Sequence, residues 1–171
     1  MSWEAKLQPD LVLGSSVVSL TPEILQRYRL KGLVLDVDET LVPLRERDVS
    51  PEVAQWVEEL RDRVPLWLVS NNLSENRIGG IARTLKLPYI IGARKPSRRK
   101  LKQAVDRMQL PVERVAMVGD RIFTDVLAAN RLGMFSILVE PTIDPARLPS
   151  YSLRNFEVLL SRWLGATLSS K

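Results

Sequence analysis

The chain has 171 residues, of which 45% are hydrophobic and 26% charged, a balance that fits one globular domain with its own core. It contains no cysteine and no histidine, which excludes disulfides, thiolate metal sites and the usual general base near neutral pH. A metal ion would need oxygen ligands, which favours a hard cation such as Mg²⁺. The net charge of +5 suits an anionic partner: a phosphate compound, an anionic lipid or a nucleic acid.

Targeting signals are not visible in the sequence. It contains no stretch of about 18 apolar residues that could span a membrane. The first ten residues also lack the basic-then-apolar pattern of a signal peptide. We therefore expect a cytoplasmic protein without a transmembrane segment. Peripheral attachment to a membrane is compatible with this expectation.

Strand-like and helix-like segments alternate along the chain. Helical spacing of apolar residues, with polar caps and a closing glycine, predicts helices in the intervals between strands. A short helix from Thr21-Pro22 to Arg29 precedes the first strand. The later helices begin at the Ser50-Pro51 cap, at Ser74, at Ser97 and near Thr124, and the last ends at Gly133. Short apolar runs predict buried strands at 33–37, 65–69, 89–91, 114–118 and 135–139.

This alternation predicts a Rossmann-like, three-layer α/β fold with a parallel sheet of about five strands and helices on both faces. We place the core domain at residues 31–141. Residues 1–30 are expected to form an N-terminal extension that packs on this core. Residues 142–171 are expected to form a tail with an amphipathic helix, which packs on the sheet or meets a membrane.

Polar residues follow the predicted strands, where the ligand site of a parallel sheet lies. On a regular strand Asp36 and Asp38 point the same way, which suits one nucleophile and one proton shuttle. A Mg²⁺ held by Asp36, Asp120 and a backbone carbonyl near Asp38 would relieve the repulsion between the acids. Lys95 and the Ser70 hydroxyl could then hold phosphoryl oxygens as charge develops on them.

Each of these pieces alone has an ordinary structural explanation. An aspartate pair after a strand is commonly a turn or a helix cap, and a serine with two asparagines is a loop signal. The combination is more specific, because all four pieces follow predicted strands in order and their chemistry fits together.

The motifs resemble those of the haloacid dehalogenase (HAD) superfamily of phosphatases. The matching residues are Asp36-Val37-Asp38-Glu39-Thr40, Ser70, Lys95 and Gly119-Asp120 with Thr124-Asp125. Val69-Ser70-Asn71-Asn72, Ala93-Arg94-Lys95-Pro96 and the run from Thr124 to Arg131 further resemble the YqeG-type proteins of bacteria, of HAD subclass III. That group is similar to the mitochondrial and plastid phosphatidylglycerophosphate phosphatases.

The resemblance implies a role for each matching residue. Asp36 would form an aspartyl-phosphate, and Asp38 would protonate the leaving group and later deprotonate water. Thr40, Ser70, Asn71 and Lys95 would serve the phosphate site, with Thr40 also supporting the nucleophile through hydrogen bonds. Asp36, Asp38 and Asp120 would serve the metal site, supported by Asp125 and Thr124. Glu39 is expected to point away into the loop.

The intervals between motifs leave no room for a cap domain. One helix fills the chain from Asp36 to Ser70, and one helix and one strand fill the chain from Ser70 to Lys95. We therefore expect an open site, covered only by residues 40–49, which we call the flap. An open site suits a bulky substrate, or it needs a neighbouring subunit to cover it.

The leading hypothesis is a Mg²⁺-dependent phosphatase acting on phosphatidylglycerophosphate, an anionic lipid at a membrane surface. One alternative keeps the chemistry but takes a soluble phosphosugar, nucleotide or phosphoprotein. Another is a non-enzymatic RNA- or ribosome-associated protein. The basic cluster at 94–102 supports it weakly, and the lack of interleaved aromatic residues argues against nucleic acid.

Overall fold

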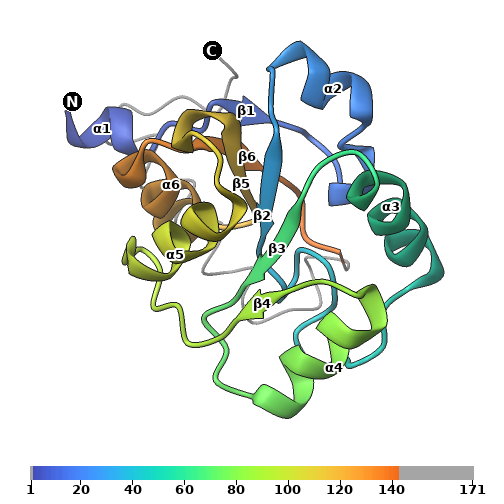
Figure 1. The fold of residues 1–171 in the computed structure, drawn as a ribbon. Coiled ribbons are helices and arrows are strands. Elements are labelled where there is room, and N and C mark those ends of the chain that lie inside the picture. Colours follow the sequence, from blue (N-terminus) through green and yellow to red (C-terminus); the bar gives the residue numbers. More distant parts are fainter. Residues whose placement is uncertain (1, 143–171) are drawn as a thin grey trace.

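The structure, a computed structural model, describes residues 2–142 of the chain. Its centre is a six-stranded sheet in the order β1-β6-β5-β2-β3-β4, in which every neighbouring pair is parallel (Figure 1). The predicted parallel α/β fold is thus confirmed, with strand ends that differ from the prediction by one or two residues. The strands are β1 (Leu11–Val12), β2 (Gly32–Leu35), β3 (Leu66–Val69), β4 (Tyr89–Ile90), β5 (Val115–Gly119) and β6 (Phe135–Leu138).

The sixth strand comes from the N-terminal segment and was not predicted. β1 pairs with β6, with Leu11 opposite Ile137, and so forms one edge of the sheet. The Asp10 amide extends this contact by donating to the Ser136 carbonyl at 3.0 Å. Two residues are too short to give an apolar run that stands out in a sequence.

Helices surround the sheet, and serine hydroxyls cap two of them as predicted. Ser50 accepts the Val53 amide at the start of α3, and Ser74 accepts the Arg77 amide at the start of α4. No helix within residues 2–142 has the length and apolar character needed to cross a membrane. The tail expected to carry an amphipathic helix lies outside the described residues. The helices are α1 (Trp3–Lys6), α2 (Pro22–Arg27), α3 (Pro51–Arg61), α4 (Glu75–Leu85), α5 (Arg99–Met108) and α6 (Leu127–Leu132), with short turns η1 (Val17–Ser19), η2 (Val112–Arg114) and η3 (Ile122–Val126).

Two helix starts differ from the prediction. α5 begins at Arg99 and its N-cap is Arg98, so Ser97 is one residue too early to cap it. The last predicted helix begins as the π-helical turn η3 at Ile122, before α6 continues to the left-handed Gly133 cap. The acid Asp125 therefore lies inside a turn rather than at a helix start.

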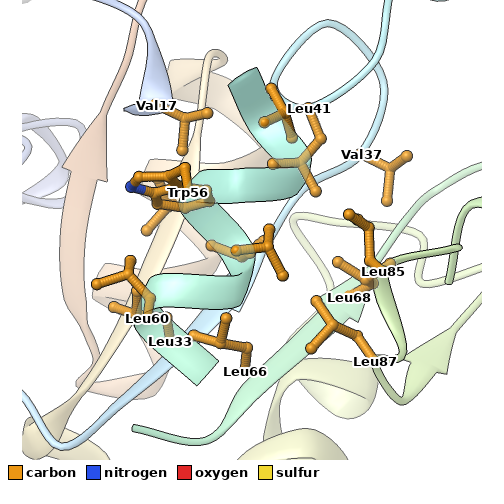
Figure 2. Close-up of a cluster of buried hydrophobic side chains, with 14 of the residues drawn as sticks. Val17, Leu33, Val37, Leu41, Trp56, Leu60, Leu66, Leu68, Leu85 and Leu87 are labelled. Atoms are coloured by element: carbon orange, nitrogen blue, oxygen red, sulfur yellow. The ribbon is translucent and has the colours of Figure 1, made fainter. Parts of the chain in front are cut away.

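Side chains alternate between the two faces of the sheet, which gives the three predicted layers. Leu33 and Leu35 of β2 face the layer of η1, α2, α3 and α4, whereas Val34 faces α5 and α6. Figure 2 shows Leu60 of α3 close to the strand residues Leu33 and Leu66, and Trp56 of the same helix beside Val17 of η1. The indole Nε1 of Trp56 also donates to the Leu20 carbonyl at 2.9 Å, which ties the N-terminal segment to α3.

The central strand β2 ends earlier than predicted. It stops at Leu35, because the amides of Thr40, Leu41 and Val42 all turn back to the Val37 carbonyl at 3.2 Å or less. Asp36 is therefore the first residue beyond the strand and Asp38 lies in the turn. The regular strand assumed for both acids is therefore absent beyond Leu35, but both side chains still line one cavity, as expected.

Candidate active site

The predicted site residues come together at the carboxyl edge of the sheet. Asp36 follows β2, Asn71 follows β3, Lys95 follows β4 and Asp120 follows β5, while Asp125 comes from η3. Their side chains surround or lie behind a cavity of about 160 Å³. Within residues 2–142 its lining consists of Asp36, Asp38, Glu39, Leu44, Asn71, Lys95, Arg121, Thr124 and Asp125.

Lys95 is the buried cation of the site. Its ammonium lies 2.7 Å from a carboxylate oxygen of Asp36 and 2.7 Å from one of Asp125, and donates to the Val69 carbonyl at 3.0 Å. Burial alone lowers the pKa of this ammonium, but the charges of Asp125 and Asp36 outweigh burial, so the pKa is raised. Lys95 is therefore a permanent positive charge, hydrogen-bonded to Asp36 and the Val69 carbonyl and ion-paired with Asp125.

Asp36 has an unusual electrostatic environment. Burial, the largest effect, and the neighbouring Asp125 carboxylate raise the pKa of Asp36 to about 7, although Lys95 opposes the change. A carboxyl group with such a strongly shifted pKa in a cavity is typical of a functional site.

Three carboxylates could share a metal ion. Asp36, Asp120 and Asp125 are buried, and one oxygen from each lies within 4.8 Å of the others. This donor set is all oxygen and negatively charged, so it fits a hard divalent cation such as Mg²⁺. Thr40 lies behind the cavity lining, and its hydroxyl donates to Asp120 at 3.2 Å, which fixes the orientation of that carboxylate.

Asp38 lines the same cavity, but its carboxylate is held apart from that cluster. One oxygen pairs with the guanidinium of Arg77 on α4, and the other accepts from the Asn72 amide group at 3.2 Å. Of the predicted metal ligands, Asp36 and Asp120 lie in the cluster together with Asp125, which was predicted only as a supporting residue, and the Asp38 side chain turns toward α4. The backbone carbonyl near Asp38 stays a prediction.

Asn71 and Ser70 support the loop after β3. The Asn71 side chain accepts from the Lys95 amide at 2.7 Å and donates to the Lys95 carbonyl at 3.2 Å, which fixes the lysine backbone. The Ser70 hydroxyl accepts from the Asn72 amide at 3.0 Å and lies behind the cavity lining. Of these two predicted phosphate-site residues, only Asn71 lines the cavity.

Comparisons with known proteins point to one family. Residues 92–158 match the family model described as HAD-hydrolase-like. The chain is 36% identical over 127 residues to "Probable phosphatase YqeG" from Bacillus subtilis (strain 168), across 74% of this chain and 73% of that protein. The chain belongs to the HAD superfamily, among its YqeG-type proteins.

Solved structures share the fold of this YqeG-type chain. An uncharacterized protein from Listeria monocytogenes serotype 4b superposes with a TM-score of 0.55 at 16% identity, over 78% of this chain and 99% of that one. A protein assigned to the HAD family of hydrolases from Streptomyces avermitilis MA-4680 gives 0.51 at 20% identity, over 66% and 77%. Such identities support the fold and carry no residue roles.

Three charged residues near the acids of this YqeG-type chain were not predicted for the site: Arg77, Glu39 and Arg121, the last of which also lines the cavity. Arg77 lies on α4, and its position in the sequence of that helix does not distinguish it from the other basic residue there, Arg83. Glu39 was expected to point away, but it is buried and lines the cavity, on a backbone with φ of 66°. The left-handed conformation at Glu39 turns the chain sharply between Asp38 and Thr40, which accounts for the difference.

Gly119 has a role that its place in the motif indicates only in part. A Cβ atom at this position would lie 2.2 Å from Asp125 Oδ2 and 2.4 Å from its Cγ. Only glycine therefore lets the Asp125 side chain approach the end of β5. Thr124, the other predicted supporting residue, lines the cavity beside it.

Proposed function

We propose that the chain is a Mg²⁺-dependent phosphatase that hydrolyses a phosphate monoester through an aspartyl-phosphate on Asp36. The observation that carries the proposal is the buried cluster in which Lys95 lies 2.7 Å from both Asp36 and Asp125. Burying several charges at a strand end costs stability and is a common mark of catalytic sites. Membership in the HAD superfamily supports phosphoryl transfer as the chemistry of this cluster.

The chain's own residues account for both halves of the reaction. One oxygen of Asp36 attacks phosphorus, the bond to the leaving oxygen breaks, and Asp38 gives that oxygen a proton. Asp38 then takes a proton from water, whose oxygen attacks phosphorus and releases Asp36 and inorganic phosphate. Lys95 provides fixed positive charge beside the phosphoryl oxygens. It can contact one of these oxygens when it gives up one of its present contacts within the protein.

Asp36, Asp120 and Asp125, with a backbone carbonyl near Asp38, would hold the Mg²⁺. When bound, Mg²⁺ supplies positive charge where phosphoryl transfer develops negative charge. Thr40 orients Asp120 for this task, and Gly119 makes space for Asp125.

The proposed substrate is phosphatidylglycerophosphate, and the proposed place of action is the surface of a membrane. The resemblance to phosphatidylglycerophosphate phosphatases is the first support. Two exposed leucines are the second: Leu44, which lines the cavity, is 43% exposed, and Leu73, after the Asn71-Asn72 loop, is 77% exposed. Leucines beside exposed Arg45, Arg47 and Arg94 suit an anionic lipid surface.

The decisive experiment is phosphate release from a substrate panel by the wild type and Asp36→Asn, with Mg²⁺ or with a chelator. We expect turnover of phosphatidylglycerophosphate in detergent micelles by the Mg²⁺-loaded wild type only. Preference for a soluble phosphosugar, nucleotide or phosphoprotein would overturn the lipid substrate and keep the chemistry. Equal phosphate release by Asp36→Asn would overturn the catalytic proposal and leave the non-enzymatic RNA- or ribosome-associated alternative.

A further inference from the structure

The side chain of Arg77 joins the Asp38 carboxylate to the flap. Its side chain leaves α4 and is buried, with the whole residue only 8% exposed. The Nη1 group pairs with Asp38, Nη2 donates to the Pro43 carbonyl at 3.0 Å, and Nε donates to the Glu46 carbonyl at 2.9 Å. All three guanidinium nitrogens therefore have an acceptor.

The two carbonyls belong to the flap. Pro43 and Glu46 enclose a turn, because the Glu46 amide also donates to the Pro43 carbonyl at 2.9 Å. Leu44, within that turn, lines the catalytic cavity. The position of this turn decides how Leu44 covers the mouth of the site.

The flap has space on its other side. Pro43 and Glu46 line a second cavity of about 360 Å³, between the flap, η1 and the start of α3. Packing behind the flap is therefore incomplete, and the guanidinium of Arg77 supplies polar contacts that hold the turn toward the catalytic side. A planar group with fixed N–H directions suits this task better than a lysine ammonium does.

We propose that Arg77 is a positioning residue that couples the closed flap to the orientation of Asp38. When the flap moves away, Arg77 loses two of its three partners, so its guanidinium no longer holds the Asp38 carboxylate in one fixed orientation. Proton delivery to the leaving group then requires the closed flap. This inference rests on the proposed function of Asp38, and it assigns the flap a part in the chemistry besides covering the site.

Leaving groups of different acidity provide the test, because a weakly acidic leaving group needs the proton more. The pair used is phenyl phosphate and p-nitrophenyl phosphate, which have similar size and different leaving-group acidity. We expect Arg77→Ala to lower kcat/KM for phenyl phosphate about 100-fold and for p-nitrophenyl phosphate less than about 10-fold. A merely structural role would lower both equally, and that result would overturn the proposal.

Three further variants make the result specific. Arg83→Ala, an exposed arginine on the same helix, should change neither substrate more than about twofold. In an Asp38→Asn background, Arg77→Ala should cause no further loss, because it acts through Asp38. Arg77→Lys keeps the charge but not the fork, and should give an intermediate loss. Full activity of Arg77→Lys would contradict the coupling to the flap.

Amide hydrogen exchange tests the coupling without turnover. We expect exchange of the Glu46 amide to be at least about 10-fold faster in Arg77→Ala than in the wild type or Arg83→Ala, because the turn loses its anchor. Unchanged exchange would overturn the flap contact even if catalysis were affected. This measurement needs no turnover, so it decides whether Arg77 holds the flap even if the wild type hydrolyses neither aryl phosphate. The proposed function is decided separately, by the lipid assay with Asp36→Asn.

Discussion

The ionised carboxylate of Asp36 is needed for the proposed attack on phosphorus, but ionising this buried group lowers the stability of the folded protein. Its folded pKa of about 7 lies far above the ordinary value of 3.8, mainly because the carboxyl is buried and next to Asp125. Between these two values the folded protein binds more protons than the unfolded chain. The contribution of Asp36 to stability therefore falls as pH rises from about 4 to about 7.

Replacing Asp36 with asparagine should remove this pH dependence. In chelator, we expect the free energy of unfolding of the wild type, relative to Asp36→Asn, to fall with rising pH by up to about 1.4 kcal/mol per unit. Above about pH 7 the difference should become constant. Urea denaturation at several pH values between about 4 and 8 measures it, and parallel profiles for the two proteins would contradict the assignment.

Lys95 should contribute far more to stability than an exposed lysine whose ammonium lies equally close to a carboxylate. Lys95→Met leaves the buried Asp36 and Asp125 without their cation, and we expect a loss of about 3–5 kcal/mol in chelator. Lys102 pairs with Asp106 at the same 2.7 Å, but its side chain is 63% exposed. Lys102→Met should therefore cost less than about 1 kcal/mol. Similar losses in urea titrations of both variants would contradict this account.

At the scale of single residues, the sequence predicted the acids better than their partners. Asp36 and Asp120 stand directly after apolar runs, and Lys95 and Asp125 stand in the loop and turn that follow later strands, so the convergence of these charges could be expected. Arg77 could not be found in this way, because its partners depend on the path of the flap, which contains no regular element.

At the scale of elements, the end of β5 and the turn η3 act together. Gly119→Ala should leave the sheet intact but displace Asp125, because the new Cβ would lie 2.2 Å from its carboxylate. We expect Mg²⁺ affinity to fall at least about 10-fold, as happens when a ligand or its support is disturbed. Isothermal titration with Mg²⁺ measures the change.

The matched control is Gly80→Ala in α4. The nearest atom to its added Cβ would be an Arg83 nitrogen at 3.9 Å, and alanine favours helices over glycine. This variant should bind Mg²⁺ like the wild type and be more stable by about 0.5–1 kcal/mol. Equal Mg²⁺ affinity in the two glycine variants would show that Asp125 tolerates the displacement.

Element types were easier to predict than element boundaries. The buried strands β2 and β5 are continuous apolar runs, and the Ser50 and Ser74 caps mark their helices. By contrast, β1 is too short to form a pattern. Its place in the sheet depends on contacts with β6, more than a hundred residues away in the chain. The early end of β2 depends on the turn back to Val37, which has no simple sequence signal.

At the scale of the whole molecule, a bound metal ion should link β2, β5 and η3. Mg²⁺ at 100 times its dissociation constant should stabilise the protein by about 2.7 kcal/mol, seen as a higher unfolding midpoint. Asp120→Asn should lose most of this gain, because it removes one of three buried ligands. Asp106→Asn, which changes an exposed acid, should retain it. An equal gain in both variants would place the ion elsewhere.

The contact between Thr40 and Asp120 spans 80 positions of the chain. The metal cluster therefore cannot exist until β2 has found β5, which requires closing a long loop. If that pairing is completed only after the rate-limiting barrier, Mg²⁺ would leave the rate of refolding almost unchanged and slow unfolding instead. The acids of the active site would then make the metal-bound protein kinetically more stable without making it fold faster.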